Sequence, residues 1–189
     1  IFLENELETS SKFFKYVFSR FNSGLASLPE NGMQSIPDNL LKKIDEENVL
    51  LENKVVEIGG QKDVVFDDGK KVHGNNIVLT GESRGLVNEP IGQYNYTKTL
   101  YISSRICPKR KEYIHLYPCD DLINNIAIPT GVSSSYSENG DHLFSVTVLN
   151  DKISENDLIN GVLRRLKDYY GGEKGDYKFL KCINIKKGT

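Results

Sequence analysis

The sequence predicts an α+β fold: a mixed, mostly antiparallel sheet with helices on one face, and a small β-meander in addition. Apolar and polar residues alternate over short runs between residues 48 and 80 and again between 97 and 149, which is the spacing of half-buried strands. Two other stretches, near the two ends, carry apolar residues at helical spacing. A chain of 189 residues with 38% hydrophobic and 26% charged residues is long enough to bury one sizeable core.

Residues 1–47 are expected to form a helical entry part of the larger domain. The stretch 10–21 predicts a helix capped by Ser10 or Ser11. Its apolar face consists of Phe13, Phe14, Val17, Phe18 and Phe21. A second, short helix is expected from Ser35 to Ile44, with Ser35 and Asp38 as a capping box. The tight loop before it, "PENGM" at 29–33, is expected to carry the chain from one domain to the next.

Residues 48–82 predict the β-meander. Its strands are expected at 48–58, 63–66 and 71–80, where the apolar period changes to two. Gly59-Gly60 and Asp67-Asp68-Gly69 lie between these runs and are typical hairpin residues.

Residues 83–189 predict the larger sheet. Four strands are expected at 97–106, 111–117, 124–129 and 142–149, and a last one at 179–185. Between them, an amphipathic helix is expected over 154–170, capped by Ser154 and ended by Gly171-Gly172.

Composition argues against several classes of function. Lys+Arg 24 against Asp+Glu 26 gives a formal charge of -2, so we expect no nucleic-acid partner. No run approaches the ~20 apolar residues of a membrane helix, and the N-terminus "IFLENELETSS" is too acidic and too briefly apolar for a signal peptide. A cytoplasmic protein is expected. The three cysteines are far apart, and we expect no metal site.

No residue is assigned a catalytic role from its pattern. The three histidines fall on different predicted strands, and Asp120-Asp121 is interpreted as turn chemistry. Tyr101, Tyr113 and Tyr117 are candidates for the wall of a substrate cavity, because aromatic rings on a sheet face can line one. Ordinary core packing of these tyrosines is the alternative.

The order of several motifs resembles a known family. "GLASLPENGMQSIPDNL" before a helix, then "VLLENKVVEI" and "NNIVLTG", resemble the middle of the flavin-containing amine oxidoreductases, the group of the monoamine oxidases, protoporphyrinogen oxidases and phytoene desaturases. Asn31 stands where the P-x-G-G-M pattern of that family has its first glycine. Further along, "INNIAIP" and "SVTVL" resemble strands of the substrate-binding domain in related NAD(P)/FAD-dependent oxidoreductases.

The resemblance implies the substrate-binding portion of an FAD-dependent oxidoreductase, with residues 48–82 belonging to the FAD-binding half. Family members hold FAD through an N-terminal βαβ unit and a C-terminal segment. We expect neither among these 189 residues, so the chain is expected to be an internal fragment that binds no FAD alone. One cofactor contact maps onto it: the backbone of Val55, in a V-x-x-I pattern with Ile58, against the adenine side of FAD.

In the full-length protein the resemblance implies hydride transfer from a small-molecule substrate to the flavin. The alternative is a non-catalytic binding or interaction module built on the same scaffold. Segments 48–52 and 76–80 would pair with the missing FAD-binding segments, so in this chain they are expected to pair with each other or to form an edge-strand dimer.

Overall fold

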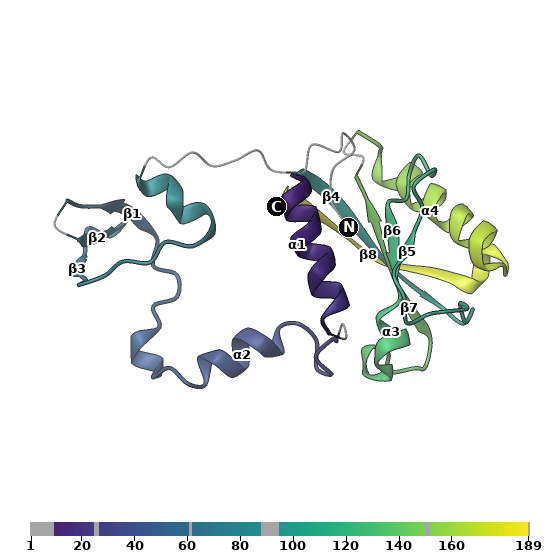
Figure 1. The fold of residues 1–189 in the computed structure, drawn as a ribbon, viewed down its shortest axis with the longest axis horizontal. Coiled ribbons are helices and arrows are strands. Elements are labelled where there is room, and N and C mark those ends of the chain that lie inside the picture. Colours follow the sequence, from purple (N-terminus) through teal and green to yellow (C-terminus); the bar gives the residue numbers. More distant parts are fainter. Residues whose placement is uncertain (1–9, 25–26, 61, 88–94, 150–151, 189) are drawn as a thin grey trace. The chain divides into compact units, whose positions relative to one another are not determined.

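The structure is a computed structural model that describes residues 10–24, 27–60, 62–87, 95–149 and 152–188. The chain divides into two compact units (Figure 1). The first comprises residues 1–37 and 94–189, and the second comprises residues 38–93. The large sheet belongs to the first unit and the meander to the second.

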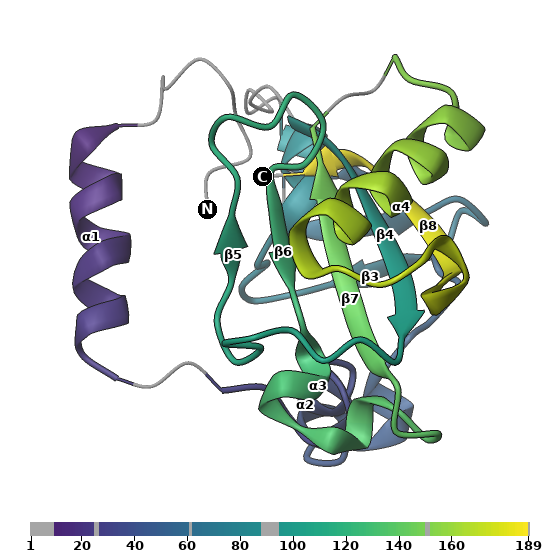
Figure 2. The same cartoon turned by 90° about the vertical axis from the view of Figure 1, so that its right-hand side faces the viewer.

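The first unit is built on a five-stranded sheet. Its strands are β4 (Asn95–Ser104), β5 (His115–Leu116), β6 (Asn125–Ala127), β7 (His142–Val148) and β8 (Tyr177–Gly188). The spatial order is β5-β6-β7-β4-β8, and every described pairing is antiparallel. The helix α4 (Glu155–Tyr170) covers one face of this sheet (Figure 2). The predicted α+β fold is confirmed.

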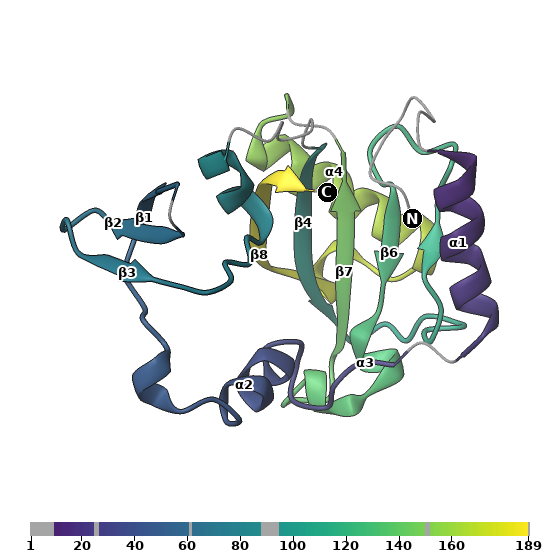
Figure 3. The same ribbon diagram turned by 60° about the vertical axis from the view of Figure 1, so that its left-hand side comes forward.

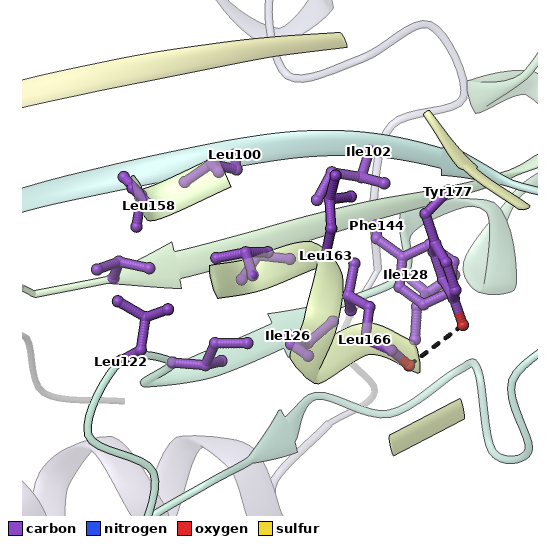
Figure 4. Packing of buried hydrophobic residues seen from close by; sticks show 14 residues of the cluster. Leu100, Ile102, Leu122, Ile126, Ile128, Phe144, Leu158, Leu163, Leu166 and Tyr177 are labelled. Carbon is purple, nitrogen blue, oxygen red and sulfur yellow. Dashed lines mark hydrogen bonds between the residues drawn. The ribbon is translucent and has the colours of Figure 1, made fainter. Parts of the chain in front are cut away.

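The core lies between α4 and the sheet (Figure 4). Alternate residues of β4 and β7 face the helix, as the period of two requires. Leu100, Ile102, Phe144 and Val146 are fully buried there, and α4 adds Leu166 on the facing side. The other cluster members are Leu122, Ile123, Ile126, Ile128, Val148, Leu158, Val162, Leu163 and Tyr177.

Both ends of α4 form as predicted. The Ser154 hydroxyl accepts the N–H of Asp157 at 3.2 Å, which satisfies a donor that the first turn leaves free. At the other end Gly171 adopts φ 81°, a left-handed conformation that glycine takes without a Cβ penalty. The Tyr177 hydroxyl donates to the carbonyls of Leu166 and Gly171 at 3.2 and 2.8 Å, so β8 is tied to the end of the helix.

Two predicted strands are much shorter than expected. The segment 111–117 contributes only His115 and Leu116 to the sheet, because Arg110 takes a positive φ of 55° and a turn joins Tyr113 to it. The segment 124–129 ends at Ala127. Pro129, which has no N–H for a ladder, instead starts a short helix, α3 (Pro129–Val132), that the sequence did not predict.

Helix α1 (Ser11–Asn22) forms as predicted, with Ser10 as its N-cap. None of its residues is buried, and Phe13 and Phe21 are more than half exposed. The following loop is anchored to the first unit, because the hydroxyls of Tyr136 and Ser135 donate to the carbonyls of Pro29 and Glu30 at 2.7 and 2.6 Å.

Helix α2 (Ser35–Leu41) is shorter than predicted, and its capping box is absent. Ser35 is the first helical residue, and its hydroxyl donates to the carbonyl of Gly32 instead of accepting an N–H from the helix. The reason is that Gly32, at φ 82°, already closes a turn there. Residues 35–37 belong to the first unit and the remainder of α2 to the second.

The second unit contains the predicted meander. Its strands β1 (Val55–Ile58), β2 (Asp63–Phe66) and β3 (Lys71–His73) pair antiparallel in that order. Short 3-10 turns lie at Glu46–Asn48 and Gly81–Val87.

Two strand predictions in this unit are too long. Residues 49–54 and 74–80 are not in strands, so the expected pairing of 48–52 with 76–80 is wrong for the described chain. Glu52, at a positive φ of 58°, interrupts the first segment. The second follows Gly74 and has no strand beside it, and Val78 within it is 86% exposed.

Candidate functional site

Figure 3 shows the face of the large sheet that is turned away from α4. Most of the side chains that the strands place on this face are polar. Since directly paired residues point to the same side, the register assigns its members. Thr99, Thr147 and Asn125 form one row across β4, β7 and β6, and Tyr101, Ser145 and Ala127 form the next. We call this surface the open face; it also includes Ser103 of β4, Lys178, Lys181 and Ile183 of β8, Leu143 of β7 and Leu116 of β5.

A bulge in β8 brings both lysines to the open face. Lys178 pairs with Ser103 and Lys181 with Tyr101, although the two lysines are three residues apart. Strict alternation would place them on opposite faces, but the register shifts between Tyr101 and Ile102, which leaves Leu180 unmatched. The bulge therefore adds two positive charges to one side of the sheet.

The polar side chains of the open face have unused hydrogen-bonding capacity. Thr99, Tyr101, Ser145, Thr147 and Asn125 are all half-buried. Within the described residues, none of their side chains has a hydrogen-bond partner, and none of their polar atoms is sealed from solvent. Since polar groups removed from water are normally paired, these five groups are suited to hydrogen bonds with water or with a bound molecule.

A carboxylate that neighbours the open face is already hydrogen-bonded. Asp141 accepts hydrogen bonds from the Ser103 hydroxyl at 2.7 Å and from the Asn139 amide at 3.0 Å. The bond from Ser103 is the main cause that holds the pKa of Asp141 below its usual value. Both bonds go to Oδ2, and Oδ1 lies 3.9 Å from Nε of Arg105. None of the residues assigned to the open face is acidic.

A small apolar cavity adjoins one end of the open face. Its volume is about 180 Å³, and Leu28, Tyr113, Ile114, Ala127 and Val132 are among the residues that line it. Ala127 belongs to both the cavity lining and the open face, so the two adjoin at β6. Tyr113, one of the predicted cavity residues, therefore lies at a cavity, with its side chain 61% exposed.

The three predicted tyrosines do not come together. Tyr101 lies on the open face, Tyr113 at the small cavity, and Tyr117 on the other side of the sheet, against α4. The substrate roles of all three stay predictions, and Tyr117 lies across the sheet from Tyr101.

Tyr117 belongs to a hydrogen-bonded chain under α4. Its hydroxyl donates to that of Tyr170 at 3.0 Å, and the Tyr170 hydroxyl lies 2.5 Å from Nδ1 of His115. His115 Nε2 lies 3.0 Å from the carbonyl of Arg110, which can only accept. Nε2 therefore carries the proton, and Nδ1 accepts from Tyr170. Burial raises the pKa of the Tyr117 and Tyr170 hydroxyls above that of free tyrosine.

A second polar cluster, around Asp120, also lies on the α4 side of the sheet. The sequence predicts a turn there but not the cluster. Asp120 accepts the N–H groups of Leu122 and Ile123 at 2.7 and 2.8 Å, which confirms the turn predicted at Asp120-Asp121. It also accepts from Arg165 Nε at 2.8 Å and from the Tyr169 hydroxyl. Burial by itself would raise the pKa of Asp120, but these hydrogen bonds and the positive charge of Arg165 lower it.

The second unit contains the single predicted cofactor contact. Val55 is the half-buried first residue of β1 and pairs with Phe66. The register shifts between Val55 and Glu57, so the backbone at Val56 is bulged out of the ladder. The contact of Val55 with FAD stays a prediction. No described glycine-rich loop leads from a strand into a helix N-terminus, so these residues do not fit a complete FAD site.

The described residues contain no cluster of three or more His, Cys, Asp or Glu able to hold a metal ion. None of the described helices combines the length and apolar character that crossing a bilayer requires.

Fold and surface together define an α+β class of protein, with a helix-backed sheet and a mostly polar open face. The sequence narrows this further: residues 1–181 match the model of the flavin-containing amine oxidoreductases, and the chain belongs to that family. The family that the sequence resembles and the α+β fold that it predicts are thus confirmed. A search of curated proteins finds no match.

Two solved structures share the fold. The PF1083 protein from Pyrococcus furiosus aligns with a TM-score of 0.61 at 16% identity, over 82% of this chain and 42% of that protein. Reduced UDP-galactopyranose mutase aligns with a TM-score of 0.64 at 14% identity, over 85% of this chain and 41% of that enzyme. This chain therefore spans about two-fifths of the length of either structure.

Proposed function

We propose that the chain is the substrate-binding portion of an FAD-dependent oxidoreductase of the amine oxidase and desaturase type. Membership of the flavin-containing family supports the redox chemistry. The open face carries the proposal structurally, because it is a broad polar surface with unpaired donors and acceptors on a rigid, helix-backed sheet. A site on regular strands holds its groups more precisely than one on loops.

The residues of this chain would bind and orient the substrate and exclude water from it. When bound in the full-length protein, the flavin would supply the redox step by accepting a hydride from the substrate. Holding the reacting bond in position is the contribution expected of a surrounding wall. Tyr101 on the open face and Tyr113 at the small cavity are the residues we place in this wall.

The flavin would be held mainly by segments of the same protein outside these 189 residues. The exposed apolar residues of the second unit support this arrangement. Leu51 is 75% exposed and Val78 is 86% exposed, and segments outside these 189 residues would cover them in the full-length protein. An edge-strand dimer through this unit is the competing arrangement, and it predicts that the chain elutes as a dimer in size-exclusion chromatography.

Isolation of the full-length protein tests the function directly. We expect a yellow protein with one FAD per chain, identified by chromatography after denaturation, whose visible flavin bands bleach when a substrate is added without oxygen. A colourless protein that still binds small molecules would instead support a non-catalytic binding module on the same scaffold.

The 189-residue chain is a second test. We expect calorimetry to detect no FAD binding to it, because a single backbone contact at Val55 cannot compensate for the entropy of immobilising the cofactor. Micromolar affinity of this chain for FAD would contradict the assignment of the cofactor to other segments.

A further inference from the structure

We infer that the open face binds a hydroxyl-rich ligand of the carbohydrate type, on which any charge is negative. This inference rests on the proposal that the open face is the substrate wall, and it names the class of substrate. It is drawn from the side chains that the sheet register brings together, their unpaired state and their charge.

The hydrogen-bonding groups of the open face form a compact array. Thr99 and Thr147 are directly paired, with Asn125 beyond Thr147, and Tyr101 pairs with Ser145 in the next row. Neighbouring strands lie ~4.8 Å apart, so the array spans about 10 Å across three strands, the scale of one sugar ring with its substituents. Four hydroxyls and an amide can each donate and accept, which suits a ligand whose hydroxyls do both.

The charges of the open face argue against an amine. Lys178 and Lys181 are its charged residues, and no residue of the open face is a carboxylate that could pair with an ammonium group. The neighbouring Asp141 accepts from Ser103 and Asn139 through Oδ2 and faces Arg105 through Oδ1, at 3.9 Å. A cationic substrate would therefore meet like charge without a counter-ion, which is unfavourable, whereas a sugar acid or sugar phosphate would be attracted.

The polarity of the surface argues against a polyene or a large apolar ring. Within β4, β6 and β7 the two central rows contain one apolar residue, Ala127, and the apolar Ile183 and Leu116 lie at the ends of one of these rows. The adjoining apolar cavity, at about 180 Å³, is smaller than the roughly 300 Å³ at which ligand pockets usually begin. An extended hydrocarbon would leave the hydroxyls of Tyr101 and Ser145 covered without partners, at a desolvation cost.

The test uses the full-length protein and two variants that remove a hydroxyl with little change of shape, Tyr101→Phe and Thr147→Val. Tyr16→Phe, on the exposed face of α1, is the matched control. Flavin content is measured first, from the visible absorption. Binding is then measured by ligand-observed NMR and calorimetry with glucose, galactose, mannose, glucuronate, cyclohexanecarboxylate, benzylamine and retinol.

We expect at least one of the four sugars to bind more tightly than benzylamine and retinol, and glucuronate to bind more tightly than cyclohexanecarboxylate, which has a carboxylate but no hydroxyls. Tyr101→Phe and Thr147→Val should each weaken sugar binding about three- to tenfold, the effect of losing one hydrogen bond. Tyr16→Phe should leave it unchanged.

The inference is overturned if benzylamine or retinol binds more tightly than every sugar, or if neither open-face variant weakens sugar binding. Its failure is distinguishable from failure of the proposed function. A protein without flavin contradicts the redox function, while the sugar titrations of the same sample still decide the class of ligand. A flavoprotein that prefers benzylamine keeps the function and contradicts the inference.

Discussion

The two units of this chain differ in how they are stabilised. In the first unit, fourteen buried side chains form one continuous cluster between α4 and the sheet. In the described part of the second unit, Phe66 is the one buried apolar residue. Both units were predicted from the same kind of alternating pattern, yet only the first encloses a core.

The difference shows what an amphipathic strand needs. The apolar face of β4 and β7 is covered by α4, which supplies Leu158, Val162 and Leu166. The meander has no helix of comparable length among its described residues, and a small sheet without such a cover is marginally stable in water. We therefore expect the first unit to account for most of the measurable stability of the chain.

The largest expected effect is that of Leu166→Ala. Leu166 is fully buried, and removing a buried leucine side chain costs about 2 to 5 kcal/mol. The matched change Leu51→Ala removes a side chain that is 75% exposed and should cost less than about 0.5 kcal/mol. Urea unfolding of the 189-residue chain, followed by circular dichroism, measures both. Equal costs would mean that the second unit has a core of its own.

Asp120→Asn should be nearly as costly, at about 2 to 3 kcal/mol. The side chains of Asp120 and Arg165 are 4% and 17% exposed, so the change leaves a largely buried guanidinium with only the exposed Asp121 as its counter-charge. Asp121→Asn is the control, because the Asp121 side chain is 88% exposed, and it should cost under 1 kcal/mol.

Asp120 also predicts an acid dependence. Its pKa in the folded chain is lower than its ordinary value of 3.8. The contribution of the Asp120 carboxylate to the free energy of unfolding is therefore complete above that pH. It is lost as the pH falls below that value toward the folded pKa. The wild-type chain should lose its advantage over Asp120→Asn in this acid range. An advantage that persists at low pH would show that the pair does not act through charge.

A smaller effect is expected from Tyr177→Phe, about 1 kcal/mol at neutral pH, because it removes the bonds to the carbonyls of Leu166 and Gly171. Burial raises the pKa of Tyr177 to about 12. The neutral hydroxyl contributes fully to the free energy of unfolding below pH 10, the ordinary pKa of tyrosine. This contribution is lost as the pH rises through about 12. Urea unfolding at successive alkaline pH values should show the variant and the wild type converging over this range. A constant difference would contradict the buried, neutral hydroxyl.

Loss of a helix cap should have a similar or smaller effect. Ser154→Ala removes the acceptor for the Asp157 N–H and should destabilise the first unit by about 1 kcal/mol. Ser83→Ala removes a hydroxyl bonded only to the backbone of Thr80 in the second unit. Hydrogen-exchange mass spectrometry should show faster exchange of β4, β7 and α4 for Ser154→Ala only. An equal response to Ser83→Ala would contradict the independence of the two units.

Local signals predicted the elements that carry the fold. Alternation identified β4 and β7, and helical spacing with Ser154 and Gly171 at its ends identified α4. Elements whose extent depends on a neighbour were predicted less well. The segment 74–80 has the composition of a strand but no strand beside it, and a ladder needs a partner. The segment 111–117 was shortened by the turn at Arg110.

The sequence by itself determined the fold class, the family and the main secondary structure, because periodicity, caps and motif order are local properties of the chain. Only the tertiary structure decided the candidate site. It placed Tyr101 and Tyr117 on opposite sides of one sheet and gathered hydroxyls from β4 and β7 into adjacent rows. It also turned Lys178 and Lys181 to the same face, because the bulge at Leu180 cancels the alternation that their spacing would impose. Register and bulges depend on how strands pair over long separations, and no local pattern encodes that pairing.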